Sequence, residues 1–224
     1  MKKLLFTLML LPVVANARTE TLTPFSEATK KGINFVSVKN QGMPASTEQI
    51  NEKGYRETSG MDEAIIHLLQ TKQEAGQQIV AYRNSSNPAD SHLHAKASEI
   101  MTGFNFIPVP GIPEKNILGF AAAGSYHQNG WDGMAEIFSF QDDAICKYST
   151  FRIEKVIIDE VTENLVNGKP AGKDIAGNDK TGFMYLIEWF NPDRRMSIEC
   201  ASRKFDPKLM TAMLEKARQV DNQK

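Results

Sequence analysis

Asp90, His92 and His94 lie within one five-residue stretch and are the most concentrated group of metal-ligand side chains. On a strand, both imidazoles would face the same way and could share a zinc ion. The surrounding apolar spacing favours a helix instead, on which residues two apart lie about 200° apart around the axis. His94 would then stack over Asp90 as a surface ion pair. We therefore expect no cofactor, and keep His92 and His94 as the alternative metal ligands.

A second group with possible chemistry occupies residues 126–133, where the sequence is Tyr-His-Gln-Asn-Gly-Trp-Asp-Gly. This polar, glycine-containing segment joins two expected strands. Aromatic rings exposed on a turn are favoured as binding anchors. Two interpretations stay open: the rings of Tyr126 and Trp131 fold back and close the end of the core, or Tyr126, His127 and Trp131 form a binding site.

Catalytic motifs are missing from the sequence. Ser125 follows Ala123-Gly124 and so lacks the first glycine of a Gly-x-Ser-x-Gly elbow. The Gly-Lys-rich stretch 168–174 lacks the glycine and the Ser or Thr that a phosphate loop needs. Catalytic groups can still be assembled from distant residues. A hydrolase using His127 or His94 with a carboxylate as general base therefore remains the alternative to a binding protein.

Two cysteines, Cys146 and Cys200, form a pair without metal-site spacing. Neither has another cysteine or a histidine within four residues. An even number of cysteines in an exported protein indicates a disulfide. We predict a structural bond between Cys146 and Cys200.

The first residues have the three parts of a secretory signal. Two lysines precede an apolar run from Leu4 to Val14, and Ala15-Asn16-Ala17 supplies small residues for cleavage. The apolar run is shorter than the roughly 20 residues that cross a bilayer. We predict that residues 1–17 are a signal peptide. The protein would then be periplasmic or secreted, of bacterial type, and without a transmembrane anchor after cleavage.

The composition is that of an ordinary globular protein. The 224 residues carry a formal net charge of −1, and 41% of them are hydrophobic. These values exclude the collagen-like, coiled-coil and disulfide-dense classes. They also argue against nucleic acid as a partner, because binding its phosphates needs a basic surface.

The N-terminal half mixes helices and strands. The apolar spacing predicts a helix over 61–75 that ends at Gly76, a strand over 78–83, and a second helix from Pro88 to Met101. Pro108, Pro110 and Pro113 stiffen the connector that follows. This connector suggests a boundary between a mixed α/β part, residues 18–110, and a second part, residues 111–224. The alternative is one continuous domain.

The C-terminal half consists mostly of strands separated by short polar turns. The expected strands cover 117–126, 134–140, 144–153, 155–166, 183–190 and 195–202. Asn167-Gly168 is typical of a type I′ hairpin turn, whereas residues 168–182 suggest a flexible loop. Asp206 and Pro207 begin a C-terminal helix. We predict an α+β fold. Its mainly antiparallel sheet is built from hairpins in the C-terminal half, and helices, including the C-terminal one, pack on one face.

The last hairpin fixes which side chains share a face. With Pro192 and Asp193 at its turn, Tyr185 pairs with Cys200. Side chains alternate across a strand, so Cys200 belongs to the apolar side of this hairpin. Cys146 must also point inward if the two sulfurs bond.

These patterns predict an exported, disulfide-bonded protein that binds another protein or an envelope component and catalyses nothing. The partner is not identified by the sequence.

Overall fold

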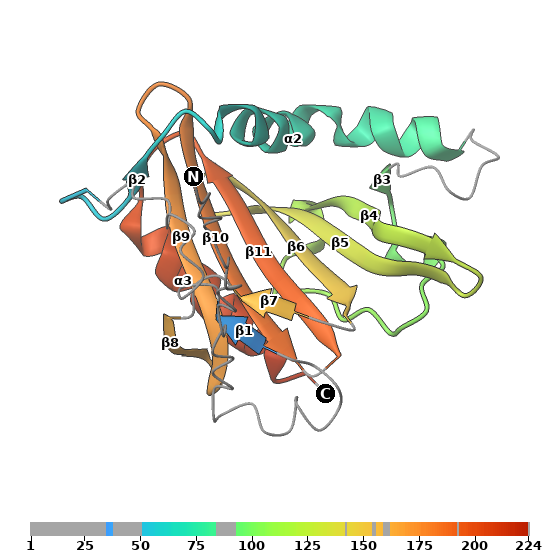
Figure 1. The fold of residues 1–224 in the computed structure, drawn as a ribbon. Helices are drawn as coiled ribbons and strands as arrows, with labels where there is room; N and C mark the ends of the chain where they lie inside the picture. Colours follow the sequence, from blue (N-terminus) through green and yellow to red (C-terminus); the bar gives the residue numbers. More distant parts are fainter. Residues whose placement is uncertain are drawn as a thin grey trace, which may run out of the picture.

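A large β-sheet forms the centre of the protein in the computed structural model, as Figure 1 shows. The model describes residues 35–37, 51–83, 93–141, 143–153, 156–158, 162–191 and 193–223. Nine strands of this part form the sheet: β2 (Arg56–Glu57), β3 (Leu93–His94), β4 (Ile117–His127), β5 (Gly130–Phe140), β6 (Ala144–Arg152), β8 (Thr162–Val166), β9 (Lys169–Asn178), β10 (Gly182–Asn191) and β11 (Arg194–Ser202).

The strand order is β2-β9-β10-β11-β6-β5-β4-β3, with β8 also paired to β9. Only the β2–β9 pair of this sheet is parallel. Two further short strands, β1 (Phe35–Ser37) and β7 (Val156–Ile158), pair in parallel with each other. The expected single strand over 155–166 is therefore divided between β7 and β8, which have different partners.

Two α-helices of the described part of the chain pack on the sheet. The amphipathic helix α3 (Pro207–Asp221) begins as expected, since the Asp206 side chain accepts a hydrogen bond from the Lys208 N–H. It buries four apolar residues in the cluster that contains both cysteines: Leu209, Met213, Ala217 and Val220. The predicted α+β fold with its C-terminal helix on the sheet is confirmed.

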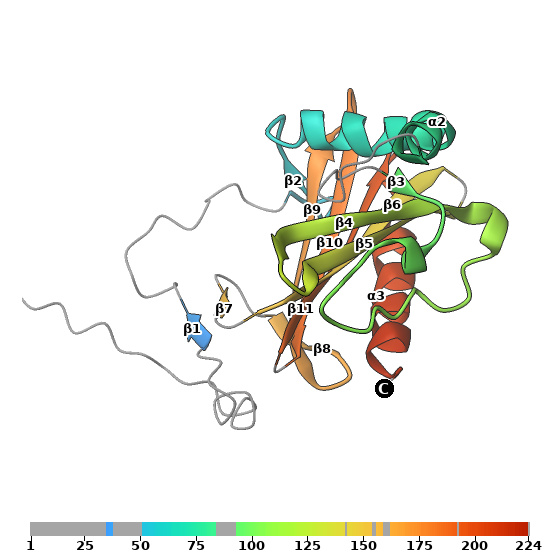
Figure 2. The same cartoon turned by 90° about the vertical axis from the view of Figure 1, so that its right-hand side faces the viewer.

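The other helix, α2 (Asp62–Arg83), crosses one end of the strands, as Figures 1 and 2 show. Its Ile65 and Leu68 belong to a separate apolar cluster, which also contains Ile145 and Ala201. These two sheet residues directly neighbour Cys146 and Cys200 in the chain, so they point to the opposite face. The two helices therefore contact opposite faces, whereas the sequence suggested a single covered face.

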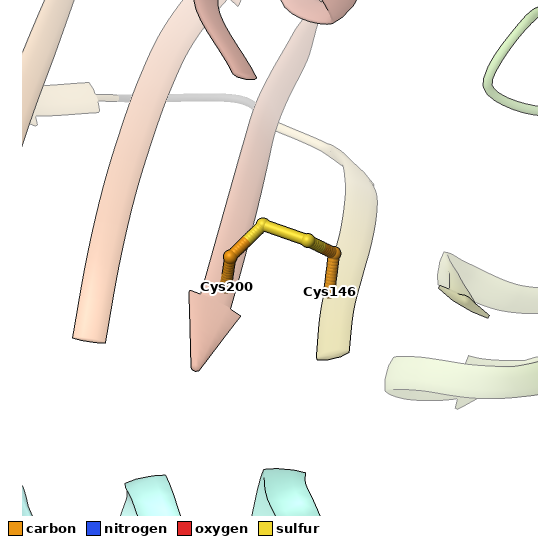
Figure 3. The surroundings of a disulfide bond; sticks show 2 residues. All are labelled: Cys146 and Cys200. Carbon is orange, nitrogen blue, oxygen red and sulfur yellow. A yellow bond between two sulfur atoms is a disulfide. The ribbon is translucent and has the colours of Figure 1, made fainter. Parts of the chain in front are cut away.

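The hairpin β10–β11 has the register predicted from the sequence. Tyr185 lies opposite Cys200, and Cys200 lies opposite Cys146 on β6. The two cysteines form a disulfide with their Cα atoms 4.0 Å apart, and both are fully buried. Figure 3 shows the bond joining β11 to β6. The predicted disulfide is confirmed, and it joins two neighbouring strands of the sheet.

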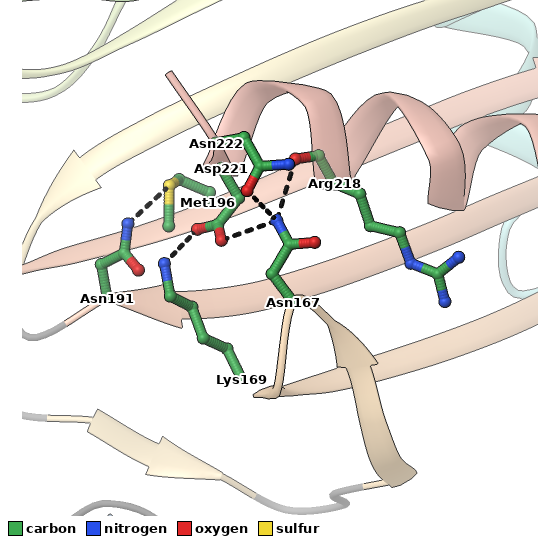
Figure 4. Close-up of polar contacts among 7 residues, drawn as sticks. All are labelled: Asn167, Lys169, Asn191, Met196, Arg218, Asp221 and Asn222. Atoms are coloured by element: carbon green, nitrogen blue, oxygen red, sulfur yellow. Dashed lines mark hydrogen bonds and ion pairs between the residues drawn. The ribbon is translucent and has the colours of Figure 1, made fainter. Parts of the chain in front are cut away.

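The turn between β8 and β9 fastens the C-terminal end of α3. Asn167 and Gly168 both have positive φ, 49° and 76°, and Val166 pairs with Lys169, which confirms the predicted tight turn. The Asn167 amide donates to the Arg218 carbonyl at 2.9 Å, capping the helix end. Lys169 forms an ion pair with Asp221, whose side chain is only 2% exposed. Figure 4 shows these contacts converging on the last turn of α3.

The helix expected to end at Gly76 continues to Arg83, so the expected strand over 78–83 is wrong. A glycine ends a helix when it adopts the left-handed conformation, and Gly76 does not have a positive φ. Inside a helix, a glycine costs only about 1 kcal/mol relative to alanine.

The helix expected from Pro88 to Met101 is also wrong over its described residues, 93–101. Leu93 and His94 form β3, and a single 3-10 turn, η3, covers Ala97–Glu99. Leu93 pairs with Ala121 on β4. Pairing with a distant strand here outweighs the local helical spacing.

The flexible loop expected over 168–182 is largely the ten-residue strand β9. Gly177 is one of the glycines that suggested a loop. It is needed in the strand, because a Cβ atom there would lie 2.2 Å from the Gly182 carbonyl oxygen. At this position, the glycine permits close approach of two strands.

The predicted signal peptide, residues 1–17, lies outside the described residues. Within the described part of the chain, no helix is long and apolar enough to cross a membrane.

Replacing Lys169 should weaken the attachment of α3. In Lys169→Ala, the buried Asp221 carboxylate loses its cation, and we expect the free energy of unfolding to fall by about 1–3 kcal/mol. Urea denaturation measures this loss. Lys208→Ala removes an exposed lysine from the first turn of the same helix and serves as the control. Equal stability of the two variants would contradict the structural role of the Lys169 ion pair.

Candidate functional site

The three predicted binding residues lie together at the end of the β4–β5 hairpin. Tyr126 pairs with Trp131 across the two strands, and His127 pairs with Gly130. The Tyr126 and Trp131 rings meet edge to face with their centroids 5.5 Å apart. The two rings differ in their surroundings, however. Tyr126 is 41% exposed, whereas Trp131 packs on the core cluster that contains Phe120.

A bulge in β4 shapes this hairpin tip. The strand register shifts between Ala123 and Tyr126, and Gly124 has a φ of +75°. A Cβ atom at Gly124 would lie 1.9 Å from Asp132 Oδ1, so a larger residue does not fit in this arrangement. The same oxygen accepts the Ser125 N–H at 2.7 Å. Asp132 therefore holds the bulge in place.

The second oxygen of Asp132 lies 3.2 Å from His127 Nε2. The carboxylate thus orients an imidazole whose side chain is 61% exposed. An oriented imidazole can bind a polar ligand or act as a general base. Because Asp132 orients His127, the hairpin tip has the geometry for either ligand binding or general-base catalysis.

Beside the tip lies an open hollow of about 510 Å³. Its size is within the range of small-ligand pockets, roughly 300–1,000 Å³. His127, Trp131 and Asp132 line it together with Arg152 at the end of β6 and Asp193 in the β10–β11 turn. Arg152 was not singled out from the sequence, because nothing in its local pattern reveals that β6 ends beside the β4–β5 hairpin.

Two exposed apolar side chains mark this region. Met101, at 55% exposed, and Tyr126 are two of the three large apolar residues that are exposed in the described part of the chain. The third, Ile66, lies on α2 and belongs to another surface. Met101 is fixed beside the tip because its carbonyl accepts the Trp131 N–H at 2.9 Å. We call Met101, Tyr126, His127, Trp131 and Arg152 the hairpin-tip surface.

His94 lies away from this surface. It is buried on β3, where it pairs with Phe120, and its Nδ1 is 4.0 Å from Glu99 Oε2. Because His94 is on a strand, the expected helical stacking over Asp90 is wrong for it. His92 and Asp90 lie outside the described residues. Among the residues that are described, no group of three or more metal-ligand side chains occurs.

Sequence reasoning also missed Glu136, a fully buried carboxyl group on β5. Its Oε2 accepts the Val109 N–H at 2.7 Å. Burial raises the pKa of Glu136 to about 7, and the Val109 hydrogen bond only partly opposes that rise. The available signal was a charged residue between Met134 and Phe138. Ala135 and Ile137 are buried as well, so the strand has no polar face, and side-chain alternation does not reveal whether Glu136 points inward or outward.

Comparison with protein-family models, curated proteins and solved structures found no match for this chain. The residues and geometry of the hairpin tip are therefore the basis for inferring function.

The two aromatic residues should respond differently to removal. We expect Trp131→Ala to lower the free energy of unfolding by about 2–4 kcal/mol, because it leaves a gap against the core. Tyr126→Ala should cost less than about 1 kcal/mol, because its ring is exposed and loses mainly one aromatic contact. Chemical denaturation of both variants tests this. A large loss in Tyr126→Ala would mean that both rings serve the core.

Proposed function

We propose that this chain is an exported, non-catalytic binding protein that contacts a partner protein of the envelope or of a host through its hairpin-tip surface. The exposure of Met101 and Tyr126, which both contact Trp131 in the lining of the hollow, is the observation that carries the proposal. Covering water-exposed apolar side chains with a partner lowers the free energy of the system and so favours binding.

The composition of this surface favours a protein as the partner. Tyrosine, tryptophan, methionine and arginine are the residue types enriched in protein interfaces. Trp131 is anchored by the core and Met101 by its main-chain bond to Trp131. Their fixed positions reduce the ordering cost of association.

The charges of the surface add a chemical preference. Arg152 has no ion pair in the described part of the chain, whereas Asp132 is occupied by Ser125 and His127. A carboxylate on the partner would complement the Arg152 guanidinium through paired hydrogen bonds. The favoured partner segment therefore joins an acidic residue to an apolar one.

The disulfide supports the proposed location. A buried bond between Cys146 and Cys200 fits an oxidising compartment, such as a periplasm or the extracellular space. Export through the predicted signal peptide would deliver the chain there.

Cross-linking in cells that export the protein tests the binding surface. We expect Tyr126→Ala, Met101→Ala and Arg152→Ala each to lower recovery of one cross-linked partner at least tenfold, as measured by quantitative mass spectrometry. Ile66→Ala removes an exposed apolar residue of α2 and is the matched control. Recovery of the same proteins from all four variants would overturn the proposed surface.

The His127–Asp132 pair supports a second candidate function, hydrolysis of an envelope polymer or peptide. There the imidazole would act as general base and Asp132 would orient it. His127→Ala separates the two functions. Loss of substrate turnover with retained partner cross-linking favours the hydrolase, and absence of turnover in the wild-type protein excludes that substrate class.

A further inference from the structure

Residues 104–113, Phe-Asn-Phe-Ile-Pro-Val-Pro-Gly-Ile-Pro, form an uncharged strap over the interior of the fold. They belong to the connection between β3 and β4, which runs alongside α3 in Figure 2. Phe106 packs on Phe120 of β4 and Tyr148 of β6, with ring centroids 6.2 and 5.7 Å apart. The strap therefore covers part of the sheet face that α3 also buries.

Few polar contacts hold the strap. Within Pro108-Val109-Pro110, Val109 supplies the only backbone donor, since proline has no N–H. That single donor is given to Glu136. Lys216 on α3 donates to the Pro110 carbonyl at 2.8 Å, and Arg194 donates to the Asn105 carbonyl at 3.2 Å. Of these three contacts, only the one from Val109 is made to a buried carboxyl group.

Glu136 has little to stabilise its negative charge. It is 0% exposed, and its Oε1 has no hydrogen-bond partner in the described part of the chain. On β5 it lies between Met134 and Phe138, which are also buried. The strand pairing places Phe120 and Tyr148 opposite it on β4 and β6.

Tyr148 of β6 is the titratable residue paired with Glu136, and the charges that act on Tyr148 come from β11 and α3. Burial raises the pKa of the Tyr148 phenol above its usual value, so this neighbour stays neutral at ordinary pH. Arg194 of β11 contacts the Asn105 carbonyl and the Phe104 ring. On α3, Lys216 contacts Pro110, and Asp221 is paired with Lys169. Neither the strap nor the paired residue of β4 supplies a charge.

We propose that residues 104–113 are a pH-controlled strap, which opens when Glu136 loses its proton and gives water access to the sheet face beneath. An ionised carboxylate in an apolar interior lacks the solvation that water would provide. The single Val109 hydrogen bond stabilises the charge only in part. Opening hydrates the carboxylate, whereas closure favours the neutral acid.

The direction of the pH effect follows from the two states. The pKa of Glu136 is about 7 under the closed strap and approaches 4.5 when water reaches it. Below pH 4.5, both states hold the proton and closure is most favourable. Between pH 4.5 and about 7, only the closed state keeps it, so the opening constant rises with pH. From pH 5 to pH 8 the rise is on the order of 100-fold.

Hydrogen exchange at the Val109 amide measures this opening directly. Protection factors, corrected for the intrinsic pH dependence of exchange, should fall on the order of 100-fold between pH 5 and pH 8 in the wild-type protein. Glu136→Gln keeps an oxygen that can accept the Val109 N–H but cannot ionise. Its Val109 protection should be independent of pH.

The amide of Ile198, in the centre of β11, is the internal control. Constant Ile198 protection with falling Val109 protection supports local opening of the strap. A parallel fall at both amides would overturn the proposal, because Glu136 would then act on global unfolding. Constant protection of Val109 in the wild-type protein would overturn it as well.

A second measurement does not depend on the folding of the variant. The Glu136 carboxyl carbon in the wild-type protein should titrate near pH 7 by NMR, and the Val109 protection should change over the same pH range. Titration near pH 4.5 would mean that the closed strap does not exclude water, and would overturn the proposal.

Discussion

Side-chain alternation across β6, β11 and β10 decides what fills the interior beneath α3. The register places Cys146 directly opposite Cys200, and both sulfurs lie among the residues that α3 covers. Their bond spans a sequence separation of 54 residues. It joins the β4–β5–β6 meander covalently to the β9–β10–β11 hairpins. In the loop-entropy description, such a cross-link destabilises the unfolded chain by roughly 4 kcal/mol. The strap contacts both halves of the sheet, because Val109 donates to Glu136 of β5 and the Asn105 carbonyl accepts from Arg194 of β11.

The strand β5 connects the two proposed functional features. Near its start, Trp131 exchanges main-chain hydrogen bonds with Met101 and Gly103, and in its middle Glu136 accepts the Val109 N–H. Residues 101–103 lead directly into the strap. The segment that carries Met101 is therefore continuous with the strap and is bonded to Trp131, which lines the hollow. The proposed binding surface and the proposed pH response are thus physically adjacent.

The sequence predicted the structure correctly where turn and capping residues agree with the alternation of side chains along the strands. The Asn167-Gly168 turn, the register of β10–β11, the start of α3 and the Cys146–Cys200 bond were all predictable for this reason. Prediction failed where distant pairing decided the structure. Leu93 joins β4 despite helical spacing, and β9 forms from a glycine-rich stretch that looks like a loop. For the candidate site, the sequence supplied Tyr126, His127 and Trp131. It did not supply Arg152, which reaches the hollow only through the packing of β6, or Glu136, whose strand is buried on both faces.

The oxidation state of Cys146 and Cys200 shows whether the two halves of the sheet are covalently joined. Protein purified without reductant is unfolded in denaturant, treated with an alkylating reagent and weighed intact by mass spectrometry. We expect no added label until a reductant is supplied, and two labels afterwards. Two labels on the unreduced protein would contradict it, because the cross-link between the meanders would then be absent.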